Sequence, residues 1–364
     1  MALDRRDIER YQRHLSLAGF GPAAQERLKA GSVLVIGAGG LGCPALLYLA
    51  AAGVGRISVV DPDSVDVSNL QRQVLYTGAD TGANKAEAAA RRLRALNPLI
   101  QVDAHPVRFE RSNALGLVRS CDLVLDGSDN FPTRYLVNDA CVIAGRPFVY
   151  GAIQGFEGQV SVFNLNGGPT YRCLFPEPPE PGTVPNCAEA GVLGAVTGMI
   201  GTAQACEAIK VLSGVGEPLS GRLLVWNALT MEACTVALRP DPAQRRITEL
   251  PPEGYGETCV AEAVSDEIDA KGLRSLLGGG GPLQLLDVRE EWEREMASID
   301  PSVHIPLGRL ETLPLSGLAP LDPSVPTVAY CAAGVRSLRA VGILRRHGFR
   351  SALSLRGGMR DWSR

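Results

Sequence analysis

Short apolar runs alternate with longer helix-forming segments over the first 150 residues of the chain. The runs are four to six residues long and cover residues 32–36, 56–61, 121–126 and 147–150, with helical stretches at 84–96 and 133–144 between them. Continuous apolar runs are typical of strands that are buried on both faces. Strands that alternate with helices predict a parallel sheet covered by helices on each side.

The same pattern continues, with one interruption, to the end of the chain. Residues 158–164 and 223–227 are expected to add strands to the first sheet. Residues 239–262 are polar and contain four prolines, which is the composition of a domain boundary. Beyond it, strands at 283–288 and 327–330 and a helix at 337–347 predict a second α/β domain.

We therefore expect two domains joined by a linker. Their predicted bounds are residues 1–240, a linker at 241–262, and residues 263–364. The first should be the larger, with a mostly parallel sheet, and the second a smaller α/β domain.

Composition places the protein among soluble, globular, cytoplasmic proteins. Of the 364 residues, 45% are hydrophobic and 21% are charged, and the formal net charge is −3. This charge argues against a surface that holds nucleic acid or anionic lipid. Nine cysteines without regular spacing indicate reduced thiols. Residues 191–212 are the most apolar long stretch, but they include Glu207 and Lys210 and are expected to form a buried helix rather than a membrane span.

A glycine-rich loop follows the first predicted strand. Residues 37–42 read Gly-Ala-Gly-Gly-Leu-Gly and open a predicted helix, where backbone N–H groups favour phosphate. Asp61 ends the next strand, where a carboxylate can accept hydrogen bonds from ribose hydroxyls. These features alone predict a dinucleotide-dependent oxidoreductase as readily as an ATP-binding enzyme.

The segments that follow favour phosphoryl chemistry. Residues 68–73 read Ser-Asn-Leu-Gln-Arg-Gln, Lys85 follows, and Asp129 precedes Asn130 after the third strand. Cations, amides and a carboxylate near a nucleotide suit charge neutralisation and a divalent metal rather than hydride transfer. Individually, Arg72 and Lys85 would be solvated surface charges and Asp129 a helix cap. The ordered set is not explained in that way, and it makes the NAD-dependent alternative remote.

Five motifs in the first domain together resemble the MoeB/ThiF adenylyltransferases, which are relatives of ubiquitin-activating enzymes. They are residues 10–14 (Arg-Tyr-Gln-Arg-His), 37–42, 68–73, 129–130 and 187–192 (Cys-Ala-Glu-Ala-Gly-Val). The resemblance implies a Rossmann-like domain in which ATP activates the C-terminal Gly-Gly carboxylate of a small β-grasp protein. It assigns ATP binding to Gly40, Asp61, Ser68, Asn69, Leu70, Gln71, Arg72, Lys85, Asp129 and Asn130. It also assigns Mg²⁺ to Asp129.

Two further residues receive roles from the same resemblance. Arg13 matches an arginine that reaches into the nucleotide site of the partner subunit, which implies a homodimer. Cys187 matches a cysteine that can bond covalently to the carrier protein. The alternative for Cys187 is an ordinary core cysteine.

The sequence departs from this family at its structural zinc site. Most members have two CxxC pairs, but Thr170 stands where the first should begin, and residues 241–246 contain no cysteine. Structural zinc takes four N or S ligands. We therefore predict no zinc, and we interpret Cys173 as an ordinary buried thiol.

The second domain resembles the rhodanese family. Cys331 lies between a predicted strand and helix, where successive backbone N–H groups would stabilise a thiolate or persulfide. The resemblance is carried by residues 330–337, 286–290, 304–308 and 355–362. It implies a sulfur carrier that holds the sulfur as a persulfide on Cys331. The alternative is an inactive rhodanese fold, which usually lacks this cysteine.

These observations lead to one main hypothesis, a fused adenylyltransferase and sulfurtransferase. A persulfide is a good nucleophile toward an acyl-adenylate, and the expected product is a C-terminal thiocarboxylate on the carrier. One alternative is an activator that only adenylates and uses its rhodanese domain for docking, and another is a non-catalytic scaffold. The sequence leaves open the sulfur donor, thiosulfate or a cysteine desulfurase. It also leaves open the pathway: molybdopterin, thiamine, tRNA thiolation, cysteine or a specialised metabolite.

Overall fold

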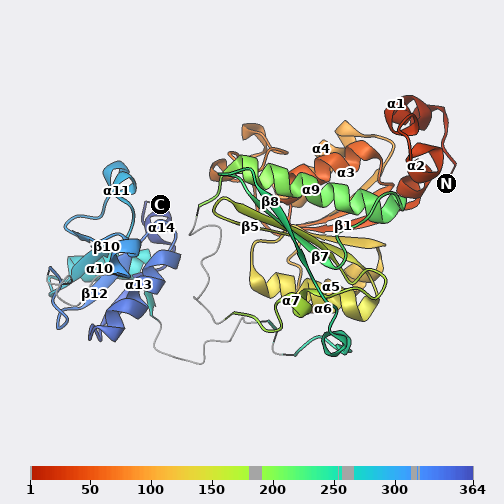
Figure 1. Ribbon diagram of the computed structural model, residues 1–364. Coiled ribbons are helices and arrows are strands. Elements are labelled where there is room, and N and C mark those ends of the chain that lie inside the picture. The colour runs from red at the N-terminus through yellow and green to blue at the C-terminus, as the bar shows by residue number, and fades with distance from the viewer. Residues whose placement is uncertain are drawn as a thin grey trace. The chain divides into compact units, whose positions relative to one another are not determined.

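The computed structural model describes residues 2–179, 191–252, 254–255, 266–312, 318 and 320–363. These residues form two compact units, Met1–Thr258 and Cys259–Arg364, and each is described by itself (Figure 1). Cys187, and with it the motif at 187–190, lies outside the described residues.

The first unit is built on one eight-stranded sheet in the order β3-β2-β1-β4-β5-β6-β7-β8. Its strands are β1 (Ser32–Ile36), β2 (Arg56–Val60), β3 (Gln101–His105), β4 (Leu123–Asp126), β5 (Phe148–Gln154), β6 (Glu157–Phe163), β7 (Arg222–Asn227) and β8 (Ala233–Ala237). Strands β1 to β5 pair in parallel, and β6, β7 and β8 continue the sheet in antiparallel fashion. The predicted mostly parallel sheet is therefore confirmed.

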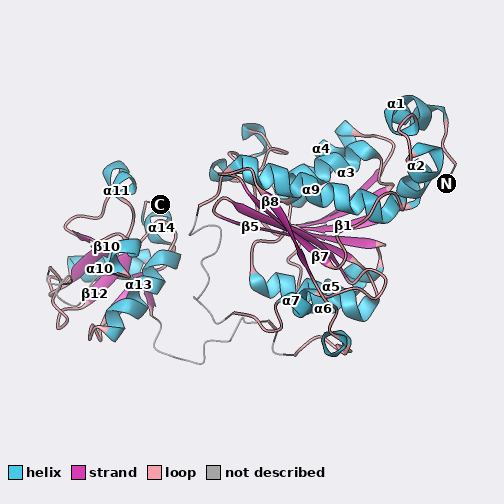
Figure 2. Ribbon diagram, viewed as in Figure 1, coloured by secondary structure: helices cyan, strands magenta, loops and turns pink. Residues whose placement is uncertain are grey.

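Helices cover both faces of this sheet, as Figure 2 shows. On one face lie α3 (Gly42–Ala52), α4 (Lys85–Leu96) and α9 (Gly194–Ser213), and on the other α5 (Arg111–Arg119), α6 (Phe131–Ala144) and α7 (Tyr171–Leu174). Successive residues of β1 point to opposite faces, so Val33 and Val35 join one core while Leu34 and Ile36 join the other. Burial on both faces explains why the central strands have continuous apolar sequences.

Two helices precede the sheet and pack at one end of α3. They are α1 (Arg5–Leu15) and α2 (Gly21–Ala30). Tyr11 lies against Gly53, where an added Cβ would come 2.4 Å from the tyrosine ring. Its hydroxyl accepts a hydrogen bond of 2.8 Å from Nδ2 of Asn97. Because Gly53 follows the last residue of α3, α1 is anchored at the end of α3 that is opposite to the glycine loop.

The second unit has a five-stranded parallel sheet in the order β11-β10-β12-β13-β9. Its strands are β9 (Glu267–Ile268), β10 (Gln284–Asp287), β11 (Val303–His304), β12 (Thr327–Tyr330) and β13 (Ala352–Leu355). Its helices are α10 (Ala270–Gly278), α11 (Glu291–Met296), α12 (Leu307–Leu310), α13 (Val335–Arg346) and α14 (Gly358–Trp362). Apolar cores on both faces of β12, one around Ala329 and one around Val328, give the predicted smaller α/β domain.

The predicted boundary between the domains stays a proposal, and the structure suggests where to place it. Residues 241–252 carry a short 3-10 helix, Pro242–Arg245, and a buried Leu250 that joins the core of the first unit. Tyr255 donates a hydrogen bond of 2.7 Å to Asp139 in α6. We therefore propose that the first folded unit extends to Tyr255 rather than ending at residue 240.

The longest apolar helix, α9, packs against α3, β5 and β6 in the first core. Its Glu207 accepts a hydrogen bond from the backbone of Leu219. Across the described ranges, no helix is both long and apolar enough to cross a bilayer.

Candidate functional site

The first candidate site lies at the carboxyl ends of β1 and β4, where the strand order of the sheet reverses, and we name this place the crevice. Ligands of open α/β sheets bind at such a switch point. The glycine loop connects β1 to α3, and Gly37 has a φ of +89°. An added Cβ on Gly37 would lie 2.8 Å from the carbonyl oxygen of Gly127, which follows β4. Only glycine allows this close approach, so residues far apart in sequence meet at the crevice.

Asp61 links the end of β2 to the glycine loop. Its carboxylate accepts hydrogen bonds from the N–H of Ala38 at 2.8 Å and of Asp63 at 2.9 Å. Burial raises the pKa of Asp61, while the nearby charge of Lys85 lowers it. The side chain of Lys85 is only 8% exposed and donates to Asp63 at 3.1 Å. A buried lysine held beside a glycine loop is not a solvated surface charge, so that alternative fails for Lys85.

Residues 68–73 lie between the glycine loop and the start of α9. Arg72 donates to the carbonyl of Ser68 at 3.2 Å. An added Cβ on Gly40 would lie 3.6 Å from Cδ of Arg72 and 3.1 Å from Thr197 in α9. Ser68 and Asn69 bond locally to Asp66, in a 3-10 helix at Val67–Asn69. The structure thus brings Gly40 and Arg72 together.

Two residues that follow β4, Asp129 and Asn130, have different roles, one as a candidate ligand for a metal and the other as a helix cap. Asn130 caps α6, because its Oδ1 accepts a hydrogen bond of 2.9 Å from the N–H of Thr133. Asp129 is exposed, and nothing in the described part of the chain binds its carboxylate. The helix cap is therefore Asn130 and not Asp129, which leaves the Asp129 carboxylate available to a ligand.

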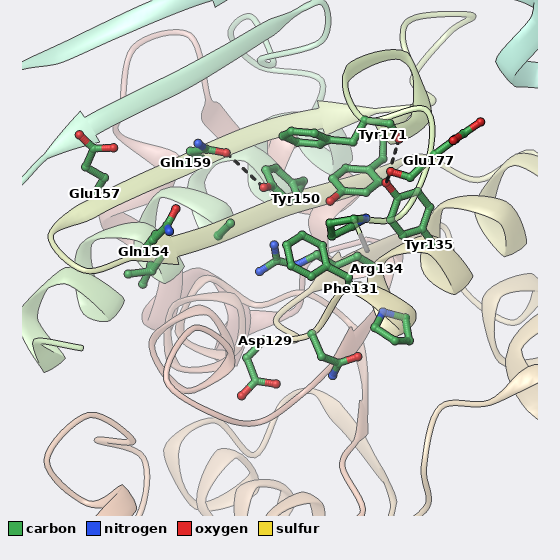
Figure 3. A pocket seen from close by; sticks show the side chains of 16 residues that line it. Asp129, Phe131, Arg134, Tyr135, Tyr150, Gln154, Glu157, Gln159, Tyr171 and Glu177 are labelled. Atoms are coloured by element: carbon green, nitrogen blue, oxygen red, sulfur yellow. Dashed lines mark hydrogen bonds between the residues drawn. The ribbon is translucent and has the colours of Figure 1, made fainter. Parts of the chain in front are cut away.

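A cavity of about 560 Å³ begins at Asp129 and continues over β5 and β6 (Figure 3). Its aromatic wall comes from Phe131, Tyr135, Tyr150, Tyr171 and Phe175. The buried Arg134 guanidinium lies over the rings of Phe131 and Tyr150, at 5.6 and 5.5 Å from their centres. The Tyr171 hydroxyl is buried and has no hydrogen-bond partner among the described residues.

Sequence reasoning missed this cavity. Arg134 could have been found from its place four residues after Asn130, one helical turn into the same helix. The tyrosines carried no signal, because β5, α7 and α6 meet only in the folded chain. Pockets with apolar walls and a few polar groups are typical of ligand sites.

Arg13 does not join the crevice of its own chain. It lies in the last turn of α1, which is anchored at the opposite end of α3. Its side chain is exposed, and its guanidinium forms no hydrogen bond or ion pair with the residues that the structure describes.

The second candidate site is the loop after β12. Cys331 is buried, and its sulfur accepts a hydrogen bond of 3.1 Å from the N–H of Gly334. Gly334 has a φ of +97°, which turns the chain directly into α13. The Ser337 hydroxyl lies 3.5 Å from the sulfur. N–H groups at the start of a helix stabilise a thiolate or persulfide anion.

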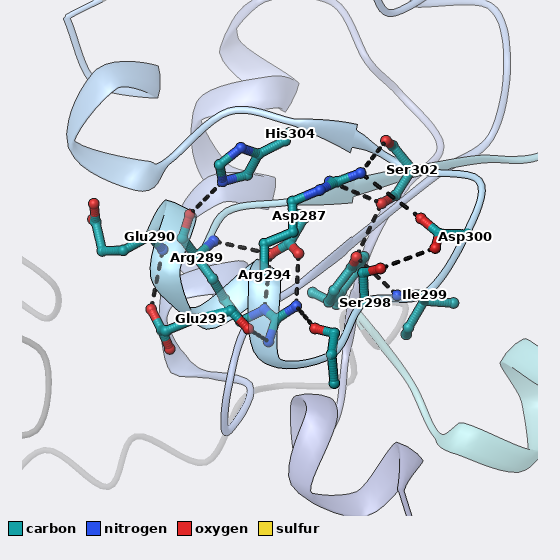
Figure 4. Close-up of polar contacts among 12 residues, drawn as sticks. Asp287, Arg289, Glu290, Glu293, Arg294, Ser298, Ile299, Asp300, Ser302 and His304 are labelled. Carbon is teal, nitrogen blue, oxygen red and sulfur yellow. Dashed lines mark hydrogen bonds and ion pairs between the residues drawn. The ribbon is translucent and has the colours of Figure 1, made fainter.

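Two ion pairs lie near this loop, one that connects it to α11 and one at the end of β10. Arg336 pairs with Glu293 through two hydrogen bonds of 2.7 and 2.6 Å. Burial raises the pKa of Glu293, but the hydrogen bonds from Arg336 and from the backbone of Glu290 prevail and hold it below its ordinary value. The motif residues Asp287 and Arg289 form a buried pair, and His304 bonds to the carbonyl of Arg289 at 2.8 Å (Figure 4). Two separate rhodanese motifs therefore meet at the base of α11.

Comparison with known proteins identifies the family of each of the two units. Residues 11–246 match the ThiF family, and residues 269–364 match the rhodanese-like domain. The chain belongs to the ThiF family and carries a C-terminal rhodanese domain, so it is an adenylyltransferase and sulfurtransferase.

Similar proteins include a probable adenylyltransferase/sulfurtransferase MoeZ from Mycobacterium tuberculosis, 47% identical over all of this chain and 94% of that protein. A sulfur carrier protein adenylyltransferase from Thermus thermophilus is 56% identical over 66% of this chain and 91% of its own length. Mouse adenylyltransferase and sulfurtransferase MOCS3 is 42% identical over 94% of this chain and 81% of that protein. The fold is also similar to Escherichia coli MccB, with a TM-score of 0.58, 22% identity, and coverage of 66% and 74%.

Proposed function

We propose that the first unit uses ATP to adenylate the C-terminal Gly-Gly of a small β-grasp sulfur-carrier protein. The observation that carries this proposal is the position of Asp129, which both follows β4 at the nucleotide crevice and lines the aromatic cavity. A substrate in the cavity would reach the phosphates at this residue. The names of the M. tuberculosis, T. thermophilus and mouse relatives support the same reaction class.

In this proposal ATP lies in the crevice with its phosphates at the glycine loop. N–H groups at the start of α3 and the cations Arg72 and Lys85 neutralise phosphate charge. Asp61 accepts hydrogen bonds from the ribose. The carrier carboxylate attacks the α-phosphorus, a new C–O–P linkage forms, and pyrophosphate leaves with the electrons of the broken P–O bond.

Mg²⁺ fits this site. It is usually bound by one or two carboxylates together with substrate phosphates and waters. The free carboxylate of Asp129, beside the crevice, supplies that ligand. When bound, the ion would neutralise charge on the phosphates and on the leaving pyrophosphate.

The cavity suits the tail of the carrier. Two terminal glycines have no side chains, so the tail can pass between Phe131 and the tyrosines. The buried Tyr171 hydroxyl has no partner in the described ranges, and a peptide group of the tail would satisfy it. The charge of Arg134 favours a carboxylate that enters the cavity.

We further propose that Cys331 supplies sulfur as a persulfide. Its terminal sulfur attacks the acyl-adenylate, forming an acyl disulfide between Cys331 and the carrier and releasing AMP. A thiol then attacks the Cys331 sulfur and releases the carrier as a thiocarboxylate, leaving a disulfide for reduction. Cys187 is the proposed attacking thiol.

The active form is proposed to be a homodimer. Arg13 is exposed and lies away from the crevice of its own chain, which supports a role in the site of a partner subunit.

The test is ATP–pyrophosphate exchange with candidate β-grasp proteins that end in Gly-Gly. The matched control is the same carrier without its last glycine, which should give no exchange. With a sulfur donor present, mass spectrometry of the carrier should show a gain of about 16 Da, the replacement of oxygen by sulfur. Exchange that does not depend on any carrier tail would contradict the proposal.

A further inference from the structure

The region where this family places structural zinc has a different donor set here. The first CxxC pair is expected at residues 170–173 and the second within residues 241–246, and Cys173 is the only cysteine in these two segments. Cys206 and Cys234 lie on other elements, α9 and β8. Within the part of the chain that the structure describes, no three His, Cys, Asp or Glu side chains form a metal-binding group. These residues do not fit a zinc ion, which needs four such ligands.

Cys173 instead bridges the two segments through hydrogen bonds. Its sulfur accepts from the N–H of Thr170 at 3.3 Å and from the N–H of Asp241 at 3.2 Å. The thiol faces the carbonyl of Asp241 at 3.9 Å. Cys173 is half-buried, so its prediction as an ordinary buried thiol was wrong. The polar groups around its sulfur are thus backbone groups of residues 170 and 241, which take the place of further side-chain ligands.

Arg245 makes the second link between the segments. Its Nη1 donates to the carbonyl of Gly168 at 2.7 Å, and its Nη2 donates to Oδ1 of Asn164 at 3.2 Å. The Nδ2 of Asn164 in turn donates to the carbonyls of Cys141 and Arg146. Asp241 caps the 3-10 helix that presents Arg245, through a hydrogen bond of 2.9 Å from Ala243.

We propose that Cys173 and Arg245 form a metal-free clamp that does the work of the zinc site. The guanidinium of Arg245 binds Gly168, which lies 77 positions earlier in the sequence. It therefore links the same two segments that a zinc ion shared between them would link. Hydrogen bonds from a charged donor are among the stronger ones in proteins. The clamp holds residues 164–175, and these include Tyr171 and Phe175 of the cavity wall.

Local hydrogen exchange of the full chain tests the clamp, with Arg246 as the matched control. Arg246 is the exposed neighbour of Arg245, and its side chain forms no hydrogen bond or ion pair with any residue in the described parts of the chain. Arg245→Ala should speed amide exchange in residues 164–175 by about 10- to 100-fold, the effect of losing charge-assisted hydrogen bonds. Arg246→Ala should leave exchange unchanged. Equal effects of the two variants would overturn the role of Arg245.

Metal analysis tests the second part of the proposal, that the clamp holds these segments without zinc. Protein expressed with added zinc should retain far less than one zinc ion per chain, and a chelator should not change exchange in residues 164–175. One tightly held zinc ion per chain, or loss of protection after chelation, would contradict the proposal. These measurements do not depend on adenylation, so they stand apart from the proposed function.

A variant with an added zinc site tests whether the clamp of Cys173 and Arg245 and a zinc ion stabilise the same segments. Thr170→Cys, Asp241→Cys and Gln244→Cys, combined with Cys173, would place one CxxC pair in each of the two segments. This variant should bind one zinc ion, and Arg245→Ala should then cost less protection than it does in the original chain. Failure to bind zinc would show that these positions are not the replaced metal site.

Discussion

The two candidate sites of this protein are assembled in different ways. The proposed nucleotide crevice would use Gly40, Asp61, Arg72, Lys85 and Asp129, which come from five separate parts of the first unit. The proposed persulfide site is a single short loop, in which the sulfur of Cys331 accepts a hydrogen bond from the backbone N–H of Gly334, three residues further along the chain. The difference follows from the ligands, because a polyphosphate presents charge over many ångströms whereas a thiolate is a single atom.

The sites also differ in charge. The crevice contains two cations, Arg72 and Lys85, of which, among the described residues, Lys85 pairs with Asp63 and Arg72 donates only to the backbone carbonyl of Ser68. In the loop at residues 331–337 the only charged side chain is Arg336, and Glu293 neutralises it. The persulfide site therefore relies on backbone N–H groups, which stabilise an anion formed in place and attract a free dianion weakly.

Cys331→Ser should give the largest effect and show that the sites are chemically separate. A serine hydroxyl cannot accept sulfane sulfur, so thiocarboxylate formation should fall to background. Pyrophosphate exchange should continue, because the crevice is untouched. Full thiocarboxylate formation from thiosulfate without free sulfide would mean that sulfur passes through another residue, and Cys187 would be examined first.

Asp129→Ala should have the opposite effect, reducing adenylation in the first unit without changing sulfur transfer in the second. Loss of the proposed magnesium ligand should reduce carrier-dependent pyrophosphate exchange by about 100- to 1000-fold, the usual cost of removing one electrostatic contact to a transition state. Transfer of sulfur from a donor to cyanide by the second unit should be unchanged. Equal loss of both activities in a folded variant would contradict two independent sites.

Mixing two inactive variants tests whether the crevice is completed by a partner subunit. Arg13→Ala alone should be inactive in exchange. After subunit exchange with Asp129→Ala, half of the dimers should contain one intact composite site, giving about a quarter of the original activity. Continued inactivity after verified exchange would exclude action of Arg13 across the interface.

Adding a positive charge to the loop at residues 331–337 should increase its attraction for a free anion, the property in which the two sites differ. Ala332→Arg should raise kcat/KM for thiosulfate by roughly 3- to 10-fold at low ionic strength, and the gain should shrink as salt screens the charge. Ala332→Gln is the control of similar length without charge. If both variants behave alike, electrostatic attraction does not limit the use of thiosulfate.

Glu293→Gln should give the smallest effect, on the stability of the persulfide site. Because the folded-state pKa of Glu293 is lowered, its contribution to stability is present above the ordinary pKa of glutamate and is lost as the pH falls through the folded value. The variant should speed amide exchange in β12 and α13 by about 2- to 5-fold at pH 7, as expected for a partly exposed ion pair. Once the pH lies below the folded-state pKa of Glu293, the two proteins should become similar, and a difference that persists in that range would exclude the ion pair as its cause.

Sequence patterns identified the elements that are stabilised by their own composition. The apolar strand β1 was predicted with its observed bounds, and α4 and α6 were predicted to within a few residues. Strands β3 and β8 were missed, because β3 is mostly polar and β8 is a short edge strand of five residues that is exposed throughout. Edge strands form by pairing with a neighbour, and that information lies in another part of the chain.

The same division holds for function. The sequence by itself determined the glycine loop and the Cys331 loop, because each depends on backbone conformation over fewer than ten residues, which glycine positions set directly. Only the tertiary structure decided that Lys85 is buried, that Asn130 rather than Asp129 caps α6, and that tyrosines from three elements line one cavity. It also showed Arg245 reaching Gly168, a link between segments 77 residues apart. Such contacts are set by packing and by the order of strands in the sheet, and no local pattern encodes them.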